Sequence, residues 1–488
     1  MLPRPDTFSN KNLSTVIKKR EKALIDSYKM EDHAVVERLT SLDLSMPRTY
    51  IRVLLVFETE ATTAEVKESL QRGLGKLSTQ IPWLSGRVVS TTTSGANPSR
   101  EIRSAAGDGL TPLDKGMIEA SYKDLSSKGM PTGAIPLDIW PVPDVLTTPL
   151  ADSGDAVFAA SVFSFADAAI GLCVCLHHNA TDATGCSEII RLWAQTLTNS
   201  DLVPLSQCRS ERLSNALSPA LAETSSLSSD NLLEQHPEYS KTPPNLPTQF
   251  YASISKQFSI PLHWIDILKD LLRKHISSPI TTNTILSALL WTSITRARTR
   301  RNLSLKDESS RLVTAVNGRR RIDETLSTPE NPYLGNMVLY ALTEHSAAEL
   351  ASSDEDSIHS LAQICNRISA SQSPSKINAH HIAEVYHLND NKEEPRNLFP
   401  GWDLFGSKDL VITSWADLEF YEMDFGEGLG KPRFVRLPLM EADGVVIVLP
   451  RRRGGDQEMI EVMVMLRVDD MQALEGDSMW QTLTSCDK

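Results

Sequence analysis

The chain has 488 residues, of which 41% are hydrophobic and 23% are charged, and its formal net charge is −13. This length exceeds what one ordinary hydrophobic core contains, so we expect two or more globular domains. The acidic balance argues against nucleic acid as a main partner. The sequence has no apolar run long enough to cross a membrane and no apolar signal core at its N-terminus, which predicts a soluble cytoplasmic protein.

The six cysteines occur without CxxC pairs and without the spacing of zinc ligands. We therefore expect reduced structural thiols rather than disulfides. Cys173 and Cys175 lie two residues apart on one expected strand, where they are poorly placed to bridge. The full set is Cys173, Cys175, Cys186, Cys208, Cys365 and Cys486.

The first folded segment combines an apolar strand with an amphipathic helix. Residues 50–57 read YIRVLLVF and predict a strand. Thr62 and Glu65 have the spacing of a capping box, and apolar residues then recur at helical intervals until Pro82. Residues 90–105 are rich in Ser, Thr and Gly and predict a hairpin or loop.

A second apolar hairpin follows, and the composition then changes. Residues 157–165 and 170–176 flank a short turn, and residues 189–197 outline an amphipathic helix. From 213 to 249 the chain is rich in Ser, Pro, Asn and Glu, which favours a linker. The predicted organisation is an N-terminal domain over 1–212, a crossover linker over 213–249 and a C-terminal domain over 250–488.

The second half again mixes helices with strands. It begins with an expected strand at 253–260, followed by helices near 264–272 and 283–296 whose apolar residues share a face. This mixture predicts an α/β or α+β fold with a large mixed sheet in each half. Further strands are expected at 312–316, 337–342, 410–413, 445–449 and 460–466.

The stretch GLCVCLHHNATDATG, residues 171–185, contains the most reactive side chains. A buried strand ends at two histidines, and imidazole can take a proton near neutral pH, so His178 is the candidate general base. His177, His178 and Asp182 could instead ligate a metal ion, but adjacent strand residues point to opposite faces. A structural role is the third alternative, and it is the one expected for the later histidine pair at 380–381.

The sequence HHNATD resembles the HHxxxD motif of the BAHD acyltransferases, which use coenzyme A (CoA) thioesters. Further segments match that family in the expected order: SLDLSMPRTY, PWLSGR, TNTILSALLW, VNGR, YLGN, TSW and DFGEG. Together they span about residues 39–475, nearly the whole chain. The stretches TSWADLEFYEMDFGEGLGKP and MEADGVVIVLPRRRG are similar to the fungal branch typified by trichothecene 3-O-acetyltransferase.

This resemblance implies two chloramphenicol-acetyltransferase-like domains with the active-site channel at their interface. It implies that His178 removes a proton from the acceptor, which attacks the thioester directly without an acyl-enzyme. Asp182 matches the motif aspartate, which points away from the reaction and pairs with a basic residue. Thr413 and Trp415 match the TSW segment, whose hydroxyl and indole N–H are suited to donate to the oxyanion.

The DFGEG segment departs from the family pattern DFGWG, because Glu427 replaces the tryptophan. The resemblance gives Asp424 and Gly426 a structural role, with the aspartate paired to Arg319. Because this segment lies away from the catalytic centre in the family, Glu427 puts the local packing in doubt but not the chemistry.

The resemblance also implies cofactor contacts, in segments that line the cofactor side of the channel in the family. These residues are Ser259, Tyr333, Gly335 and Asn336. Basic clusters at 296–301, 319–321 and 451–453 are candidates for the CoA phosphates, although such runs are commonly solvated surfaces.

We therefore expect a monomeric CoA-dependent acyltransferase that moves an acyl group, with acetyl as the first expectation, to a hydroxyl or amine of a small secondary metabolite. Acyl-CoA and the acceptor are the expected partners, without nucleic acid, membrane, metal or a permanently bound cofactor. Three alternatives stay open: a condensation-type enzyme that uses carrier-bound acyl chains, a metal-dependent hydrolase, and a catalytically silent binding protein. The TSW and DFGxG segments favour free CoA over a carrier protein.

Overall fold

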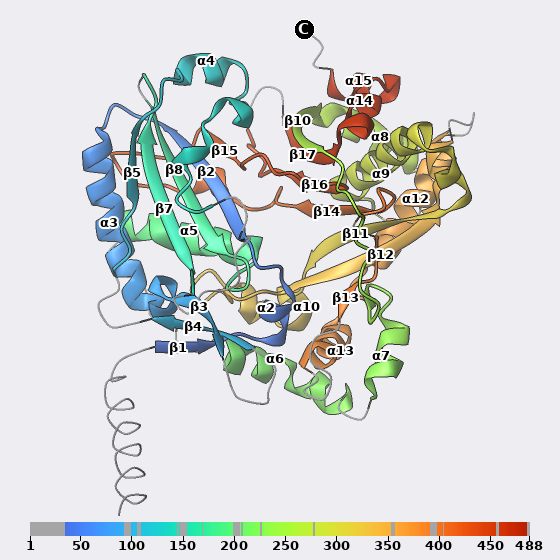
Figure 1. The fold of residues 1–488 in the computed structure, drawn as a ribbon, viewed down its shortest axis with the longest axis horizontal. Coiled ribbons are helices and arrows are strands. Elements are labelled where there is room, and N and C mark those ends of the chain that lie inside the picture. Colours follow the sequence, from blue (N-terminus) through green and yellow to red (C-terminus); the bar gives the residue numbers. More distant parts are fainter. Residues whose placement is uncertain are drawn as a thin grey trace, which may run out of the picture.

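The computed structural model describes residues 35–485 except for 92–98, 105–108, 144–145, 147–153, 168, 199–204, 206–207, 225–226, 277–278, 353–356, 391–397, 404 and 455–457. The N-terminal segment without a signal core and Cys486 lie outside these residues. No helix in the described part combines the length and apolarity needed to cross a membrane. Figure 1 shows two large sheets side by side, each covered by helices.

The N-terminal half is built on a five-stranded sheet in the order β15-β2-β8-β7-β5. Its neighbouring strands β2 (Tyr50–Glu58) and β8 (Ala169–His177) are antiparallel and almost entirely buried. β7 (Phe158–Ser164) pairs antiparallel with β8, which confirms the second predicted hairpin. Helices α3 (Thr63–Gln80) and α5 (Ala183–Thr198) pack on each other beside this sheet (Figure 1).

Smaller elements complete this half. The predicted capping box starts α3, because Thr62 Oγ1 accepts from Glu65 N while the Glu65 carboxylate accepts from Thr62 N. β3 (Arg87–Thr91) and β4 (Ser99–Ser104) pair antiparallel, so the region at 90–105 contains a hairpin. The others are β1 (Val35–Arg38), α2 (Ser41–Ser45), β5 (Leu113–Met117), α4 (Tyr122–Ser127) and β6 (Asp155–Ala156).

The C-terminal half contains a six-stranded mixed sheet in the order β10-β17-β16-β14-β11-β12. Its strands confirm those expected in this half: β10 (Ser253–Pro261), β11 (Ser309–Asn317), β12 (Val338–Ser346), β14 (Leu410–Ser414), β16 (Val445–Val448) and β17 (Met459–Arg467). α9 (Thr282–Arg301) is buried on nearly all sides, because apolar and small residues surround most of its length. The accompanying helices are α8 (Leu262–Leu272), α11 (Ala347–Ala351), α12 (Ser357–Ser371), α14 (Val468–Glu475) and α15 (Ser478–Thr484).

Residues 213–249, predicted as the crossover linker between the two domains, contain helices and a short strand. These residues contain most of α6 (Arg209–Thr224), all of α7 (Ser229–Gln235) and the short strand β9 (Tyr239–Ser240), which pairs with β13 (Phe399–Pro400). Leu213 and Leu217 of α6 are fully buried, and α6 packs on α13 (Ala379–Asp390). Leu213, Leu217 and Leu221 recur at helical spacing, but the polar composition around them concealed this signal.

One strand of the second half belongs to the sheet of the first half. β15 (Phe434–Arg436) comes from the second half but pairs antiparallel with β2 in the first. Arg436 is buried, and its Nη1 and Nη2 atoms lie 3.0 and 2.9 Å from the carboxylate of Glu461 on β17. A partly buried ion pair thus joins the two sheets. The boundaries of the two domains stay a prediction.

Candidate active site

His178 directly follows β8, one of the buried strands of the N-terminal sheet. Its backbone N–H donates to Thr49 O at 2.8 Å, and its carbonyl oxygen accepts from Asn336 Nδ2 at 2.9 Å. The backbone of the residue is therefore held from both sides. Thr49 belongs to the first half and Asn336 to the second, so both halves position this histidine.

The imidazole of His178 is half-buried, and its Nδ1 atom is enclosed without a hydrogen-bond partner among the described residues. Burial lowers the pKa of His178 below its ordinary value of 6.5, and this effect outweighs the opposing contributions of its own carbonyl group and of Asp182. The side chain is therefore neutral near pH 7, which is the form that can accept a proton.

His177 is completely buried and has a different environment. Its Nδ1 accepts from Asn179 N at 3.2 Å, and its Nε2 lies 3.4 Å from Asp155 Oδ2. Its ring makes an edge contact with Tyr50 at a centroid distance of 5.4 Å. This is the packing role that alternation of side chains along a strand predicts.

Asp182 forms a buried, bidentate ion pair with Arg319 of the second half. Each carboxylate oxygen lies 3.0 Å from one guanidinium nitrogen. The same oxygens accept the backbone N–H groups of Gly185 and Met337, each at 2.8 Å. Because four donors surround it, Asp182 is engaged away from His178 and is not available to a metal ion shared with the histidines.

Arg319 also donates to the YLGN segment. Its Nε donates to Tyr333 O at 2.9 Å and its Nη2 to Gly335 O at 2.7 Å. The expected pairing of Arg319 with Asp424 is wrong: the Asp424 carboxylate is on an exposed residue and accepts from Gly426 N at 2.9 Å. Gly426 has a φ of +85°, so the DFGEG segment is a local turn.

The DFGEG turn is fixed by its aromatic residue. Phe425 is buried, and its ring contacts Phe57 and Trp193 of the first half at centroid distances of 5.1 and 6.3 Å. Glu427, which replaces the family tryptophan, is exposed. The substitution therefore leaves the packing of Phe425 intact.

A second buried network, which sequence reasoning missed, holds the loop around His178. Asp43 Oδ1 accepts from Asn336 N at 2.8 Å and from Asn336 Nδ2 at 2.9 Å. Asn179 Nδ2 donates to the carbonyl oxygens of Asp43 and Met46, both at 2.8 Å. The Thr40–Asp43 spacing of a capping box was a visible signal, because this box starts α2.

The TSW segment lies in the C-terminal sheet. Thr413 is on β14, opposite Ile447 of β16, and is half-buried. Trp415 is only 6% exposed and belongs to the same hydrophobic cluster as Leu176 and Ala180, which flank the histidine pair. This cluster contains residues of both halves, so Trp415 is buried in a core that the two halves share.

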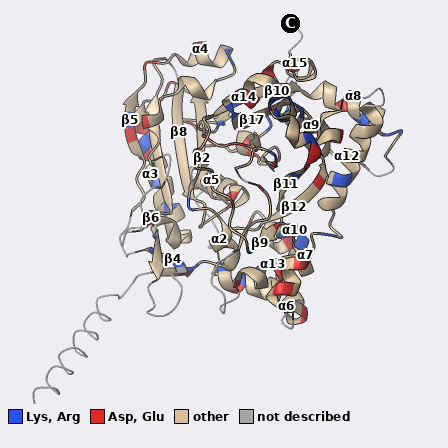
Figure 2. Ribbon diagram, turned by 45° about the vertical axis from the view of Figure 1, so that its right-hand side comes forward, with Lys and Arg blue, Asp and Glu red and all other residues tan. Residues whose placement is uncertain are grey.

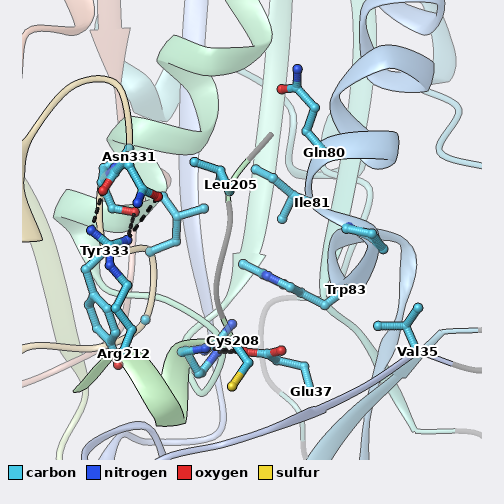
Figure 3. Close-up of a pocket in the computed structure, with 15 residues that line it drawn as sticks. Val35, Glu37, Gln80, Ile81, Trp83, Leu205, Cys208, Arg212, Asn331 and Tyr333 are labelled. Carbon is cyan, nitrogen blue, oxygen red and sulfur yellow. Dashed lines mark hydrogen bonds and ion pairs between the residues drawn. The ribbon is translucent and has the colours of Figure 1, made fainter. Parts of the chain in front are cut away.

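The four expected cofactor residues do not share one environment. Ser259 is half-buried on β10. Asn336 is fully buried and its amide donates to Asp43 and to His178 O, so its position suits support of the loop. Tyr333 and Gly335 line a pocket with Trp83, Ile81 and Arg212, and Figure 3 shows Tyr333 and Arg212 across this pocket from Trp83.

Most arginines of the basic clusters form ion pairs with carboxylates of the same chain. Arg298 is buried against Asp443 at 3.2 Å, Arg301 lies 2.5 Å from Asp470, and Arg300 lies 3.0 Å from Asp477. Arg451 and Arg453 pair with Glu458 and Asp417. The exposed members of the clusters are Arg300, Arg320, Arg452 and Arg453.

Two models of known protein families match the chain. The model of the Transferase family matches residues 144–479, and that of the trichothecene 3-O-acetyltransferase-like N-terminal domain matches residues 49–196. The first match covers more than half of the chain. The chain therefore belongs to the Transferase family, and it is an acyltransferase of the BAHD type.

Individual proteins and solved structures are similar to the chain over most of its length. The chain is similar to trichothecene 8-O-acetyltransferase of Fusarium sporotrichioides, with 27% identity over 90% of this chain and 96% of that protein. The structure of F. sporotrichioides TRI101 complexed with coenzyme A and T-2 matches with a TM-score of 0.74 and 20% identity, covering 92% of this chain and 99% of that one. Vinorine synthase matches with a TM-score of 0.61 and 16% identity, covering 92% and 94%. These structures confirm the expected two-domain acyltransferase fold.

Proposed function

We propose that this protein transfers an acetyl group from acetyl-CoA to a hydroxyl group, or alternatively an amine, of a small secondary metabolite. The observation that carries the proposal is the position of His178, which is held at the end of a buried strand by backbone hydrogen bonds to residues of both halves. The relatives that match over most of the chain are named O-acetyltransferases, and one matched structure contains coenzyme A with T-2.

In the proposed mechanism His178 is the general base. Because its Nδ1 is enclosed, Nε2 is the nitrogen assigned to the acceptor. Nε2 takes the hydroxyl proton while the oxygen forms a bond to the thioester carbonyl carbon. The tetrahedral intermediate then collapses, the C–S bond breaks, and the leaving thiolate takes the proton from the imidazolium. No acyl-enzyme is required.

Thr413 and Trp415 are proposed to act on the oxyanion side. A hydroxyl and an indole N–H are the donor types that stabilise a developing oxyanion in a water-poor site. The half-buried position of Thr413 and the burial of Trp415 in the hydrophobic cluster that also contains Leu176 support this assignment. Ser259, Tyr333 and Gly335 are proposed to face the cofactor, whereas Asn336 is assigned to the support of His178.

We also propose that the enzyme is a monomer and lies in the cytoplasm. Residues of both halves of one chain hold His178, so a second subunit is not needed to complete the loop. The alternative of a condensation-type enzyme makes a different prediction, because it requires acyl chains bound to a carrier protein.

The test is a screen of acyl-CoA donors against alcohols and amines with the purified full-length chain, read by release of the CoA thiol and by product mass. We expect acetyl-CoA to be consumed without any carrier protein, and only when an acceptor is present. Consumption that depends on an added carrier protein would instead support the condensation-type enzyme. No turnover with any pair, by a folded protein, would support a silent binding protein.

A further inference from the structure

A cluster of histidines and carboxylates lies away from the proposed catalytic loop, between the end of α7 and the helix α13. His236 follows α7, Glu238 precedes β9, and His381 and Glu384 lie on α13. His236 is 1% exposed and Glu238 4% exposed. Figure 2 shows α13 and α7 together at the lower side of the molecule, with acidic residues on α13.

The atoms of three of these residues converge. His236 Nδ1 lies 2.9 Å from Glu238 Oε1, and His381 Nε2 lies 3.5 Å from the same oxygen. One nitrogen of each histidine and one carboxylate oxygen all lie within 4.8 Å of one another. Ligand atoms of a tetrahedral zinc ion are separated by about 3.3 Å when each lies about 2.0 Å from the metal. Two of the observed separations, 2.9 and 3.5 Å, lie close to this value.

His381 Nε2 is enclosed without a hydrogen-bond partner in the described part of the chain, although it faces Glu238. A buried polar atom is costly when it has no partner.

His236 has the second feature of a metal ligand, a carboxylate on its other nitrogen. Its Nε2 lies 3.2 Å from Glu384 Oε2, while Glu384 Oε1 lies 3.2 Å from His380 Nε2. Histidines that bind metals commonly donate their second ring N–H to a carboxylate, which fixes the ring and its tautomer. This leaves Nδ1 of His236 directed at Glu238 and His381.

We propose that His236, Glu238 and His381 bind a divalent transition-metal ion, with Zn²⁺ as the best fit, and that Glu384 orients His236. Two imidazoles and one carboxylate are a donor set that suits zinc better than calcium or magnesium, which prefer oxygen ligands. The ion would join the segment between α7 and β9 to α13, two parts of the chain far apart in sequence. This proposal does not depend on the acyl-transfer reaction.

The site would be structural rather than catalytic. α13 contacts α2, where Ser41 Oγ donates to Tyr386 O at 3.3 Å, and α2 carries Asp43 of the network around His178. An ion that fixes α13 would thus stabilise an element that supports the active-site loop from behind. It would add no group to the reaction itself.

The test uses the full-length chain without an affinity tag, stripped with a chelator and then titrated with Zn²⁺ in competition with a chromophoric chelator. We expect one tight Zn²⁺ site per chain and a rise in the melting temperature with Zn²⁺ that Mg²⁺ does not reproduce. His381→Gln and Glu238→Gln should each weaken binding at least about 100-fold, and Glu384→Gln about 10- to 100-fold.

The matched control is the exposed pair His275 and His359, whose ring centroids lie 5.7 Å apart. The double change of both to Gln should leave the tight site unaltered. If wild-type protein binds no stoichiometric Zn²⁺, or if tight binding persists in a folded His381→Gln or Glu238→Gln variant, the proposal is overturned. Should these variants fail to fold, the wild-type stoichiometry alone decides.

Discussion

Asp182 and Arg319 face each other with both carboxylate oxygens 3.0 Å from guanidinium nitrogens, 137 residues apart in sequence and 2% exposed on each side chain. This pair fixes the loop that follows His178 to the YLGN segment of the second half. It explains why an aspartate is placed four residues after the candidate base without taking part in proton transfer.

Asp182→Ala should destabilise the fold as much as it lowers the rate, because it leaves the Arg319 guanidinium buried without its counter-charge. Breaking one partner of a buried pair costs about 3–5 kcal/mol of unfolding free energy. Chemical denaturation and thiol-release assays would measure both effects. Asp424→Ala is the control, with an expected loss within about 1 kcal/mol, because that carboxylate is exposed and accepts one backbone N–H. Equal losses in the two variants would contradict the assignment of Arg319 to Asp182.

His178→Ala should remove acyl transfer while the protein remains folded. A general base contributes roughly 10²–10⁴-fold to a rate, and the half-buried ring can be truncated at smaller cost than a core side chain. Single-turnover release of the CoA thiol is the measurement, with circular dichroism to verify folding. His177→Ala serves as a contrast, since its fully buried ring should lower stability. Normal turnover by the His178 variant would exclude it as the base.

The pH dependence of kcat/KM should report the lowered pKa of His178. Burial lowers this pKa below 6.5, and the neutral form is the active one. The rate should therefore stay constant as pH falls toward 6.5 and decline only when the pH drops below that value. Initial rates in buffers from pH 4.5 to 8.5 would give the profile. An inflection clearly above pH 6.5 that disappears in His178→Ala would contradict the direction of the shift.

Asn336→Ala separates support of the loop from contact with the cofactor. The amide holds Asp43 at 2.9 Å and the His178 carbonyl at 2.9 Å, so its loss should disturb the base more than the binding of CoA. We expect kcat to fall by about 10-fold or more, as for a lost hydrogen bond to a charged group, with little change in KM for acetyl-CoA. A raised KM for acetyl-CoA with unchanged kcat would instead support the direct contact between Asn336 and the cofactor that the resemblance implies.

The sequence predicted the parts of this protein that depend on local patterns. The strand before His178 is short, apolar and β-branched, and the helix after Thr62 carries its own capping box, so both could be located without tertiary information. Alternation along a strand also predicted that His177 and His178 point to opposite faces, and the resemblance to the family then selected His178 as the base. These are effects of neighbouring residues on one another.

The missed features depend on residues far apart in sequence. Asp43 and Asn336 meet across 293 residues, and His236 meets Glu384 across 148. A single sequence contains no signal for such pairs, and the polar composition around α6 and α7 even favoured a linker there. For the same reason the resemblance to the family placed Arg319 on the wrong aspartate, since both candidates are distant from it.

Gly185→Ala should be among the most damaging small substitutions in the chain. A Cβ at this position would lie 2.3 Å from the carbonyl oxygen of Leu334, a backbone atom that cannot move without displacing the segment bound to Arg319. Overpacking of this kind typically costs about 1–3 kcal/mol, so the unfolding midpoint and the rate should fall together. Gly75→Ala on α3 is the matched control, because a Cβ there meets nothing within 4 Å and alanine favours a helix over glycine by about 1 kcal/mol. The two variants should therefore shift the denaturation midpoint in opposite directions. A stable, fully active Gly185→Ala protein would show that Gly185 and Leu334 of the other half do not approach as closely as the structure has them.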